Sequence, residues 1–437
     1  MNLRKSAFNS AVLGVTLWFI LLSQTLVSAA QNDTGEFQSW HWKMGLDERL
    51  RWEYKHDFDF NERREDNGSL FFHRLKASGT VTFTDEYLKE KAVIFAEGLD
   101  AQTGGYQLKP QATQVDNFDF HQGYLQLFNI LGSGIDLKGG RMEAKYGNGR
   151  LIAQPAWSNR MRHFDGGILH FARSGGFMDV LYLQDVKYDD KNFNRSSGRE
   201  LLTGLYGGYQ QHKMATLYEL YILPQIITTG SSAIDRYTVG TRLKGFLPYQ
   251  VSWEVEFPYQ FGTSGTKDIR AHALNVSLDK GWETAWKPKV YFEYNQASGD
   301  DSSTDGEINT FMPLYQSTHD PYGLLDYFRW QNMREVASKF DISPFNKWKI
   351  TPQMNFFWLE NKNDSWYGSS GNVIRNKITG NRGYYVGQEV SLRAFYEINK
   401  NLKWESGYAH FFTGEYVKDS GAHDDTDWVY SQISFKY

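Results

Sequence analysis

Apolar and polar residues alternate with a period of two from residue 40 to the end of the chain, and helical periodicity is scarce. The segment 40–54 is the clearest case. Its even positions include Met44, Leu46, Leu50, Trp52 and Tyr54, and its odd positions include Lys43, Asp47, Arg49, Arg51 and Glu53. A strand that is charged along one whole face needs water on that face, and its apolar face needs lipid or a protein core.

The same alternation predicts eighteen strands in all. Their predicted ranges are 40–54, 70–83, 88–98, 118–128, 135–146, 166–173, 178–187, 201–210, 214–223, 236–244, 249–261, 269–280, 286–296, 328–342, 346–360, 384–397, 402–413 and 426–437. In 70–83, Phe71 and Leu75 stand on one face, with Phe72 and Arg74 on the other. The parity of 135–146 stays open, since a bulge there would shift it.

The links between these strands alternate in length. The long links are 55–68, 99–117, 147–165, 188–200, 224–235, 297–327, 361–383 and 414–425. Short links of a few residues lie between them, and 262–268 is the exception, short where a long link is expected. The pattern predicts an all-β, transmembrane antiparallel β-barrel of about 18 strands, with short periplasmic turns and long extracellular loops. A soluble sandwich has no reason to keep this alternation, and no fixed-length repeat indicates a propeller.

The N-terminus reads as a secretory signal peptide over residues 1–30, followed by a barrel over 31–437. Arg4 and Lys5 precede an apolar run, 11–22, that is too short to span a bilayer, and small residues follow at 27–30. A retained anchor is the alternative, and the polar residues 31–33 that follow at once speak against it. An exported chain that ends on an aromatic residue, Tyr437, is typical of outer-membrane barrels.

Composition narrows the picture further. The chain has no cysteine, so closure and backbone hydrogen bonds must replace disulfides as the source of stability. Its 27 Tyr, 30 Phe and 14 Trp suit a barrel with aromatic girdles at both membrane interfaces. A formal net charge of -4 argues against nucleic-acid binding but leaves room for a basic lumen offset by acidic loops.

Two segments are more specific than the periodicity. The first runs from Gly140-Arg141 through Tyr146-Gly147-Asn148-Gly149-Arg150 to Trp157-Ser158-Asn159-Arg160-Met161-Arg162-His163-Phe164-Asp165-Gly166. The second contains Asn309-Thr310-Phe311-Met312-Pro313, His319, Tyr322-Gly323, Asp326 and Trp330-Gln331-Asn332. With the signal peptide and the strand count, these segments resemble the bacterial alginate export family of outer-membrane channels over most of the mature chain.

The resemblance implies a monomeric barrel of eighteen strands in the outer membrane, and a narrow arginine-rich lumen like the one through which the family's type member conducts an anionic polysaccharide. Residues that match the first motif are Arg150, Trp157, Asn159, Arg162, Phe164 and Asp165, with Arg141 as the arginine that precedes it. Arg49 and Arg74 lie on strand faces that read as inward. We therefore expect Arg49, Arg74, Arg141, Arg150, Trp157, Asn159, Arg160, Arg162 and Asp165 to line the conduction path.

The basic cluster has two interpretations that do not depend on the family. Guanidinium groups stay charged and bind carboxylates in a bidentate manner, so a ring of them selects anions at a constriction. Alternatively, the arginines pair with Glu143 and Asp165 and pin an inward-folded loop. For Arg49 and Arg51, ion pairs with Asp47 and Glu53 are the favoured interpretation. Trp157 offers a ring to sugar C–H groups, although packing explains most of the aromatic residues.

Other chemistry finds little support. Ser158, His163 and Asp165 are the residue types of a catalytic triad, but residues in one short loop rarely converge in that geometry. The eleven histidines show no metal-ligand spacing, and the acidic run 300–307 lacks a complete calcium-loop pattern. We expect a passive channel for an anionic saccharide or a small anion, without catalytic residues, cofactor or metal. An outer-membrane barrel enzyme and a secreted soluble β-rich binding protein are the alternatives, and both export and uptake fit the sequence.

Overall fold

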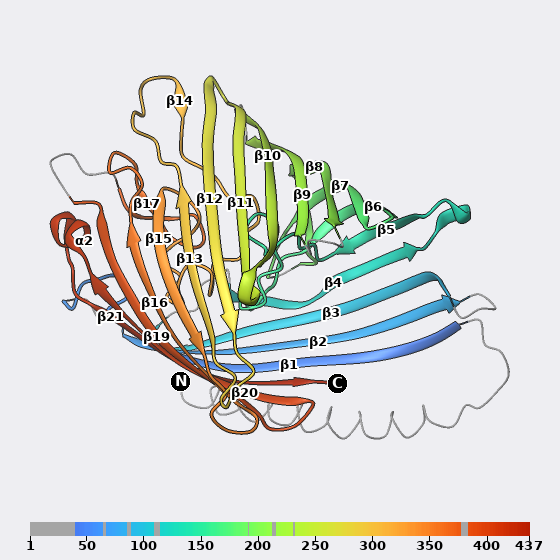
Figure 1. The fold of residues 1–437 in the computed structure, drawn as a ribbon, viewed down its shortest axis with the longest axis horizontal. Helices are drawn as coiled ribbons and strands as arrows, with labels where there is room; N and C mark the ends of the chain where they lie inside the picture. Colours follow the sequence, from blue (N-terminus) through green and yellow to red (C-terminus); the bar gives the residue numbers. More distant parts are fainter. Residues whose placement is uncertain are drawn as a thin grey trace.

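The computed structural model describes residues 40–63, 67–84, 89–108, 114–190, 192–211, 216–229, 232–376 and 383–437. Within these ranges one large sheet closes on itself as a barrel (Figure 1). Its wall strands are β1 Trp40–His56, β2 Gly68–Thr84, β3 Glu90–Tyr106, β4 Asp116–Leu127, β5 Ile135–Met142, β6 Phe164–Arg173, β7 Gly176–Lys187, β8 Arg195–Gln211, β9 Thr216–Thr229, β10 Ser232–Leu247, β11 Val251–Ser264, β12 Lys267–Gly281, β13 Lys289–Ala297, β15 Met333–Asp341, β16 Trp348–Trp358, β19 Tyr385–Glu397, β20 Leu402–Thr413 and β21 Thr426–Lys436.

The eighteen wall strands follow one another around the barrel in chain order, each antiparallel to the next. The last strand, β21, pairs with the first, β1, with Asp47 opposite Lys436 and His56 opposite Asp427. Figure 1 shows the colours running around the wall from blue to red until the two ends meet. This closure leaves no free sheet edge, which is what a strand-built protein needs in order to span lipid.

A few short elements lie outside the wall. β14, Glu307–Ile308, pairs in parallel with the start of β12, and β17, Trp366–Tyr367, pairs with β18, Val373–Arg375. The helix α2, Glu415–Ser420, follows β20. Two 3₁₀ turns, Ile130–Gly132 and Pro248–Gln250, lie at the short-link end. In the part of the chain that the structure describes, no helix is long and apolar enough to cross a membrane.

The two faces of the wall agree with the predicted alternation. On β1, Met44 and Leu50 point outward and are exposed, whereas Arg49 and Arg51 are buried inside the barrel. On β2, Phe71 is exposed and its neighbour Phe72 is buried. Because exposed apolar side chains recur on most of the wall strands, these side chains face lipid. The parity predicted for these two strands is therefore confirmed.

All eighteen predicted strands are present, and their ends differ from prediction in informative places. The segment 135–146 stops at Met142 because the chain then turns into the lumen, and the segment 328–342 starts only at Met333 for the same reason. The exceptional link 262–268 shortens to the two residues between β11 and β12. The predicted signal peptide, residues 1–30, lies outside the described residues.

Two long links fold into the barrel instead of covering it. We call residues 143–163 the first inward loop and residues 298–332 the second inward loop. Both contain largely buried residues, among them Leu151 and Ile152 in the first and Phe311 and Trp330 in the second. They correspond to the two specific sequence segments, so the motifs of those segments belong to the interior of the barrel.

Candidate functional site

The first inward loop crosses the lumen from one wall to the other. It leaves β5 and turns at Gly147 and Gly149, whose φ angles of 55° and 80° favour glycine. Asn148 then contacts Glu254 of β11, and Arg150 Nη2 lies 2.6 Å from Glu293 Oε1 of β13. These strands stand across the ring from β1, so the loop divides the lumen.

On its way back the loop is held by three arginines of the β1–β2 wall. Arg49 Nη1 and Arg74 Nη1 each donate to the carbonyl oxygen of Ala156, at 2.9 Å in both cases. Arg74 also donates to the carbonyl oxygen of Ser158 at 3.0 Å, and Arg51 donates to that of Trp157 at 2.9 Å. We call these three residues the arginine clamp. Charged donors to backbone carbonyls make strong hydrogen bonds, so Arg49 and Arg74 have the geometry of loop anchors.

The two inward loops meet in the middle of the lumen. Ala153 N donates to Tyr315 O at 2.8 Å, and Tyr315 N donates to Leu151 O at 2.6 Å. Ser317 N adds a third bond, to Gly149 O at 3.0 Å. Ile152 and Tyr315 thus form a parallel β-bridge between the loops, which satisfies backbone groups inside the lumen.

Aromatic packing connects the second inward loop to the wall at β16. Phe328 stacks on Phe357 of β16 with ring centroids 3.9 Å apart. Trp330 is fully buried against Phe311, and Trp366 Nε1 donates to Tyr327 O at 2.9 Å. The apolar cluster under this loop is a core inside a barrel, and it narrows the lumen along the part of the wall that runs from β16 to the end of β1.

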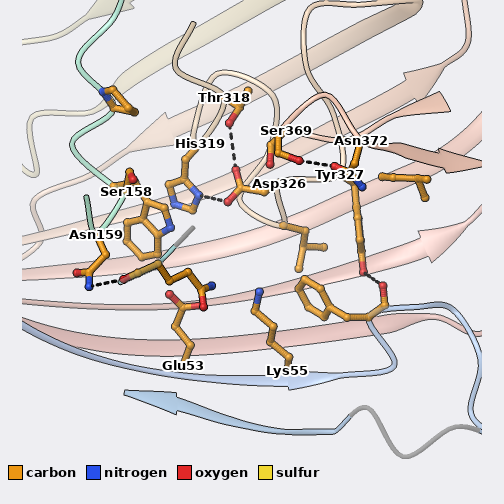
Figure 2. A pocket seen from close by; sticks show the side chains of 18 of the residues that line it. Glu53, Lys55, Ser158, Asn159, Thr318, His319, Asp326, Tyr327, Ser369 and Asn372 are labelled. Carbon is orange, nitrogen blue, oxygen red and sulfur yellow. Dashed lines mark hydrogen bonds and ion pairs between the residues drawn. The ribbon is translucent and has the colours of Figure 1, made fainter. Parts of the chain in front are cut away.

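Above the loops, at the long-link end, lies a cavity of 1220 Å³ that we call the outer cavity. Figure 2 shows Glu53 and Lys55 rising from β1 toward His319 and Asp326 of the second inward loop. His319 Nδ1 lies 3.3 Å from Asp326 Oδ2, and Thr318 also contacts this carboxylate. The basic side chains that line the cavity are those of Arg51, Lys55, Arg160, Arg162 and Arg375. The acidic ones are those of Glu53, Asp59 and Asp326.

Arg160 and Arg162 are the two motif arginines that face this cavity. The Arg160 guanidinium lies 4.1 Å from the centre of the Tyr188 ring, and Arg162 Nη1 makes a long contact of 3.4 Å with Gln316 O. Among the described residues no carboxylate comes within ion-pair distance of either side chain, whereas Arg51 pairs with Glu53 at 2.8 Å. Asn159 also lines the cavity, and its amide donates to the carbonyls of Gln102 and Gln114.

The remaining predicted residues are engaged elsewhere. Arg141 makes a bidentate pair with Asp165, at 2.7 and 2.9 Å, and also donates to Asn194 O. Arg150 is buried against Glu293 and lines a smaller cavity on the far side of the loop. The expected partnership of Arg141 with Asp165 is therefore present, but Glu143 lies next to His121 and not next to an arginine.

Trp157 lines the outer cavity, but both of its faces are covered. The His319 ring stacks on it with a centroid separation of 3.9 Å, and the Arg51 guanidinium carbon lies 3.8 Å from the ring centre. Two groups at these distances must occupy opposite faces. Only the ring edge is left for a sugar, so the geometry favours the packing role for Trp157.

Among the lumen arginines that the sequence analysis did not identify are Arg236 of β10 and Arg329 of the second inward loop. Neither has a carboxylate within ion-pair distance among the described residues, and each donates to an amide or carbonyl oxygen, of Gln225 and Pro313. Burial lowers the pKa of Arg329 to about 10, and the nearby charges of Arg162 and Arg236 also lower it. Arg236 could have been predicted to face the lumen, because it shares the inward face of β10 with Arg242.

Ser158, His163 and Asp165 do not form the hydrogen-bonded chain of a catalytic triad. Both ring nitrogens of His163 lack a hydrogen-bond partner among the described residues, so no hydrogen bond joins it to Ser158 or Asp165. Asp165 instead accepts from Arg141 and from Ser196 Oγ. A nucleophile–base pair needs such a bond, and this loop does not have it.

A second cavity, of 930 Å³, lies at the short-link end of the barrel. Its charged lining is mainly lysine, with Lys287, Lys347, Lys349, Lys403 and Lys436 against Glu397 and Glu405. Lys403 pairs with Glu397 at 2.8 Å, and Lys436 lies 3.2 Å from Asp47. Both ends of the lumen therefore carry more basic than acidic side chains.

Comparison with known proteins agrees with this architecture. A family model described as alginate export matches residues 41–431. No curated protein matches the chain. Among solved structures, Pseudomonas aeruginosa OccK2 (OpdF) in complex with glucuronate is 10% identical, with a TM-score of 0.60 and 90% of this chain and 97% of that chain covered. P. aeruginosa OccK11 (OpdR) is 14% identical, with a TM-score of 0.56 and 90% and 95% covered. Acinetobacter baumannii OccAB1 is 10% identical, with a TM-score of 0.58 and 93% and 99% covered. At these identities the likeness is one of fold.

Proposed function

This chain belongs to the alginate export family and is a channel of the bacterial outer membrane, and we propose that it passes an anionic saccharide, or a related small anion, down its gradient. Arg160 and Arg162 act as the selective groups. The arginine clamp, Arg141 and Arg150 hold the first inward loop in the position that presents these two side chains to the outer cavity.

One observation carries this proposal. Of the arginines in the first specific segment, Arg160 and Arg162 face the outer cavity without a carboxylate partner among the described residues. An unpaired guanidinium in a narrow lumen attracts anions more strongly than it would in bulk water, because the effective dielectric there is well below that of water. Arg236 and Arg329 extend the same field deeper, behind Arg162.

A uronate is the substrate class that we favour. The family description names alginate, and one structure of similar fold is a complex with glucuronate. A carboxylate on each sugar matches guanidinium groups in bidentate geometry. We further propose that the barrel works as a monomer in outer-membrane lipid, without catalytic activity. The family and the fold are those of transport channels.

The test is single-channel recording in planar bilayers with the Arg160→Gln, Arg162→Gln double variant. At low salt we expect a lower ratio of anion to cation permeability than in the unmodified protein, and weaker block by an oligouronate. The difference should shrink at high salt, since the Debye length falls from about 10 Å at 0.1 M to about 3 Å at 1 M.

The matched control is the double variant Arg173→Gln, Arg270→Gln, which removes the same charge from two exposed positions outside the cavity lining. It should keep the selectivity of the unmodified protein. Unchanged selectivity in a folded Arg160→Gln, Arg162→Gln barrel would contradict the proposal, and equal loss in both double variants would show that only net charge matters.

A further inference from the structure

A cluster of imidazole and carboxylate groups lies where the first inward loop leaves the wall. Glu97 comes from β3, His121 from β4 and Glu143 from the first residue of the loop. One ligand atom from each lies within 4.8 Å of the others. His121 Nε2 is 2.8 Å from Glu143 Oε1 and 4.0 Å from Glu97 Oε1, and His121 is almost completely buried.

A second histidine, His163, lies beside the cluster. His163, from the end of the same loop, is 1% exposed, and both of its ring nitrogens lack a hydrogen-bond partner among the described residues. Its ring lies 4.6 Å from that of His121, at an angle of 79°. Buried polar atoms without partners are rare and costly, so an unpartnered imidazole next to three potential ligands indicates a missing partner at this place.

The surroundings orient the carboxylates as the outer shell of a metal site does. Gln122 Nε2 donates to Glu97 Oε1 at 3.0 Å, and Gln154 donates to Glu143 Oε2. Such outer hydrogen bonds hold ligating side chains in place. Lys76 Nζ, 3.4 Å from Glu97 Oε2, is the cation with which a metal ion would compete.

We propose that Glu97, His121 and Glu143 bind a divalent transition-metal ion such as Zn²⁺, with His163 turning inward as the fourth ligand. Two imidazoles and two carboxylates suit the preference of this ion for four nitrogen and oxygen ligands. Bound there, the ion ties both ends of the first inward loop to the β3–β4 wall. No spacing pattern along the chain reveals this set, because its members come from two strands and the two ends of a loop.

The first experiment needs no substitution. The full-length mature protein, without a polyhistidine tag, is purified in detergent, stripped with a chelator and titrated with Co²⁺. We expect visible absorption bands typical of low-coordinate Co²⁺ that saturate at one equivalent and are abolished by Zn²⁺. If the Co²⁺ absorption does not saturate although the barrel is folded, as shown by its shift in gel mobility on boiling, the proposal is overturned.

Variants then locate the site. His121→Ala and Glu97→Gln should each weaken Co²⁺ binding at least tenfold, and Lys76→Met should strengthen it, because the competing cation is gone. His410→Ala is the matched control: it removes a histidine that also contacts two carboxylates, Asp425 and Asp427, on another part of the wall, and should leave binding unchanged. Equal weakening in His121→Ala and His410→Ala would overturn the proposed location.

The fourth ligand has its own readout. His163→Gln should weaken binding and change the Co²⁺ spectrum, since one nitrogen donor is replaced by an amide oxygen or water. An unchanged spectrum and affinity would remove His163 from the site and overturn the four-ligand proposal. These outcomes are separate from anion selectivity, because neither Arg160 nor Arg162 belongs to the cluster.

Discussion

The two inward loops narrow the same lumen but are held by different forces. The first inward loop is held mainly by hydrogen bonds from the arginine clamp to backbone carbonyls, and by ion pairs such as Arg150 with Glu293. The second also makes polar contacts with the wall, such as Leu324 N to Glu389, but it adds stacked and buried rings, with Phe328 on Phe357 of β16. A loop held through its backbone can vary its own side chains, and this leaves Arg160 and Arg162 free to meet a solute.

The largest effect should come from the apolar side of this comparison. Trp330→Ala removes a fully buried indole from the cluster under the second inward loop, and we expect the free energy of unfolding to fall by about 3–5 kcal/mol. Urea unfolding of the protein in lipid vesicles measures it. Trp286→Ala, at a residue that is 60% exposed in a turn, should change it by less than about 0.5 kcal/mol. Similar losses in both variants would mean that the cluster inside the barrel is not a core.

An intermediate effect is expected on the polar side. The Arg49→Leu, Arg74→Leu double variant should assemble as a barrel, because the strand pairing of β1 and β2 is untouched. The carbonyl oxygens of Ala156 and Ser158 would lose their donors, at a cost of about 1–3 kcal/mol for each unsatisfied group. The first inward loop should therefore open more often.

A thiol probe measures this opening directly, since the chain has no cysteine of its own. Ser158→Cys should react with a water-soluble maleimide at least ten times faster in the double variant than in the otherwise unmodified protein. The control background carries Arg173→Leu and Arg270→Leu, two exposed positions, and should leave the rate unchanged. Equal rates in all three backgrounds would show that the arginine clamp does not hold the loop.

The smallest effect should come from the ion pair at the outer end of the same loop. Arg141 and Asp165 are 14% and 27% exposed at their side chains, and water weakens such a pair. Asp165→Asn should lower the free energy of unfolding by about 1 kcal/mol and leave anion selectivity intact. A loss of selectivity in this variant would place Arg141 in the conduction path. The arginines that hold the loop could then not be separated from those that select anions.

Much of the wall could be predicted because its signal is local. Successive side chains of a strand point to opposite faces, so Leu50 outward and Arg51 inward follow from the sequence of β1 alone. The strand ends were less predictable where the chain leaves the wall early, at Met142, or joins it late, at Met333. There the residues keep an apolar composition because they are buried inside the lumen.

The roles of the arginines could not be assigned in the same way. Arg49 meets the carbonyl of Ala156 across 107 positions of the chain, and a carbonyl oxygen leaves no trace in the residue type that carries it. Composition therefore cannot separate an arginine that holds a loop from one that faces a cavity. Arg329 was missed because its neighbours in the lumen, Arg162 and Arg236, come from another loop and from a distant strand.

The pairing of β1 with β21 has a consequence for how the protein is made. Leu46 and Tyr437 exchange two backbone hydrogen bonds, at 3.1 and 2.9 Å, so the seam joins the two extremes of the barrel sequence. Bringing such distant segments together has a high entropic cost and makes folding slow. Until β21 has been synthesised and exported, both edge strands lack their partner. The nascent chain must therefore be shielded from other strands throughout its transit, and loss of β21 would be as damaging to barrel closure as loss of β1.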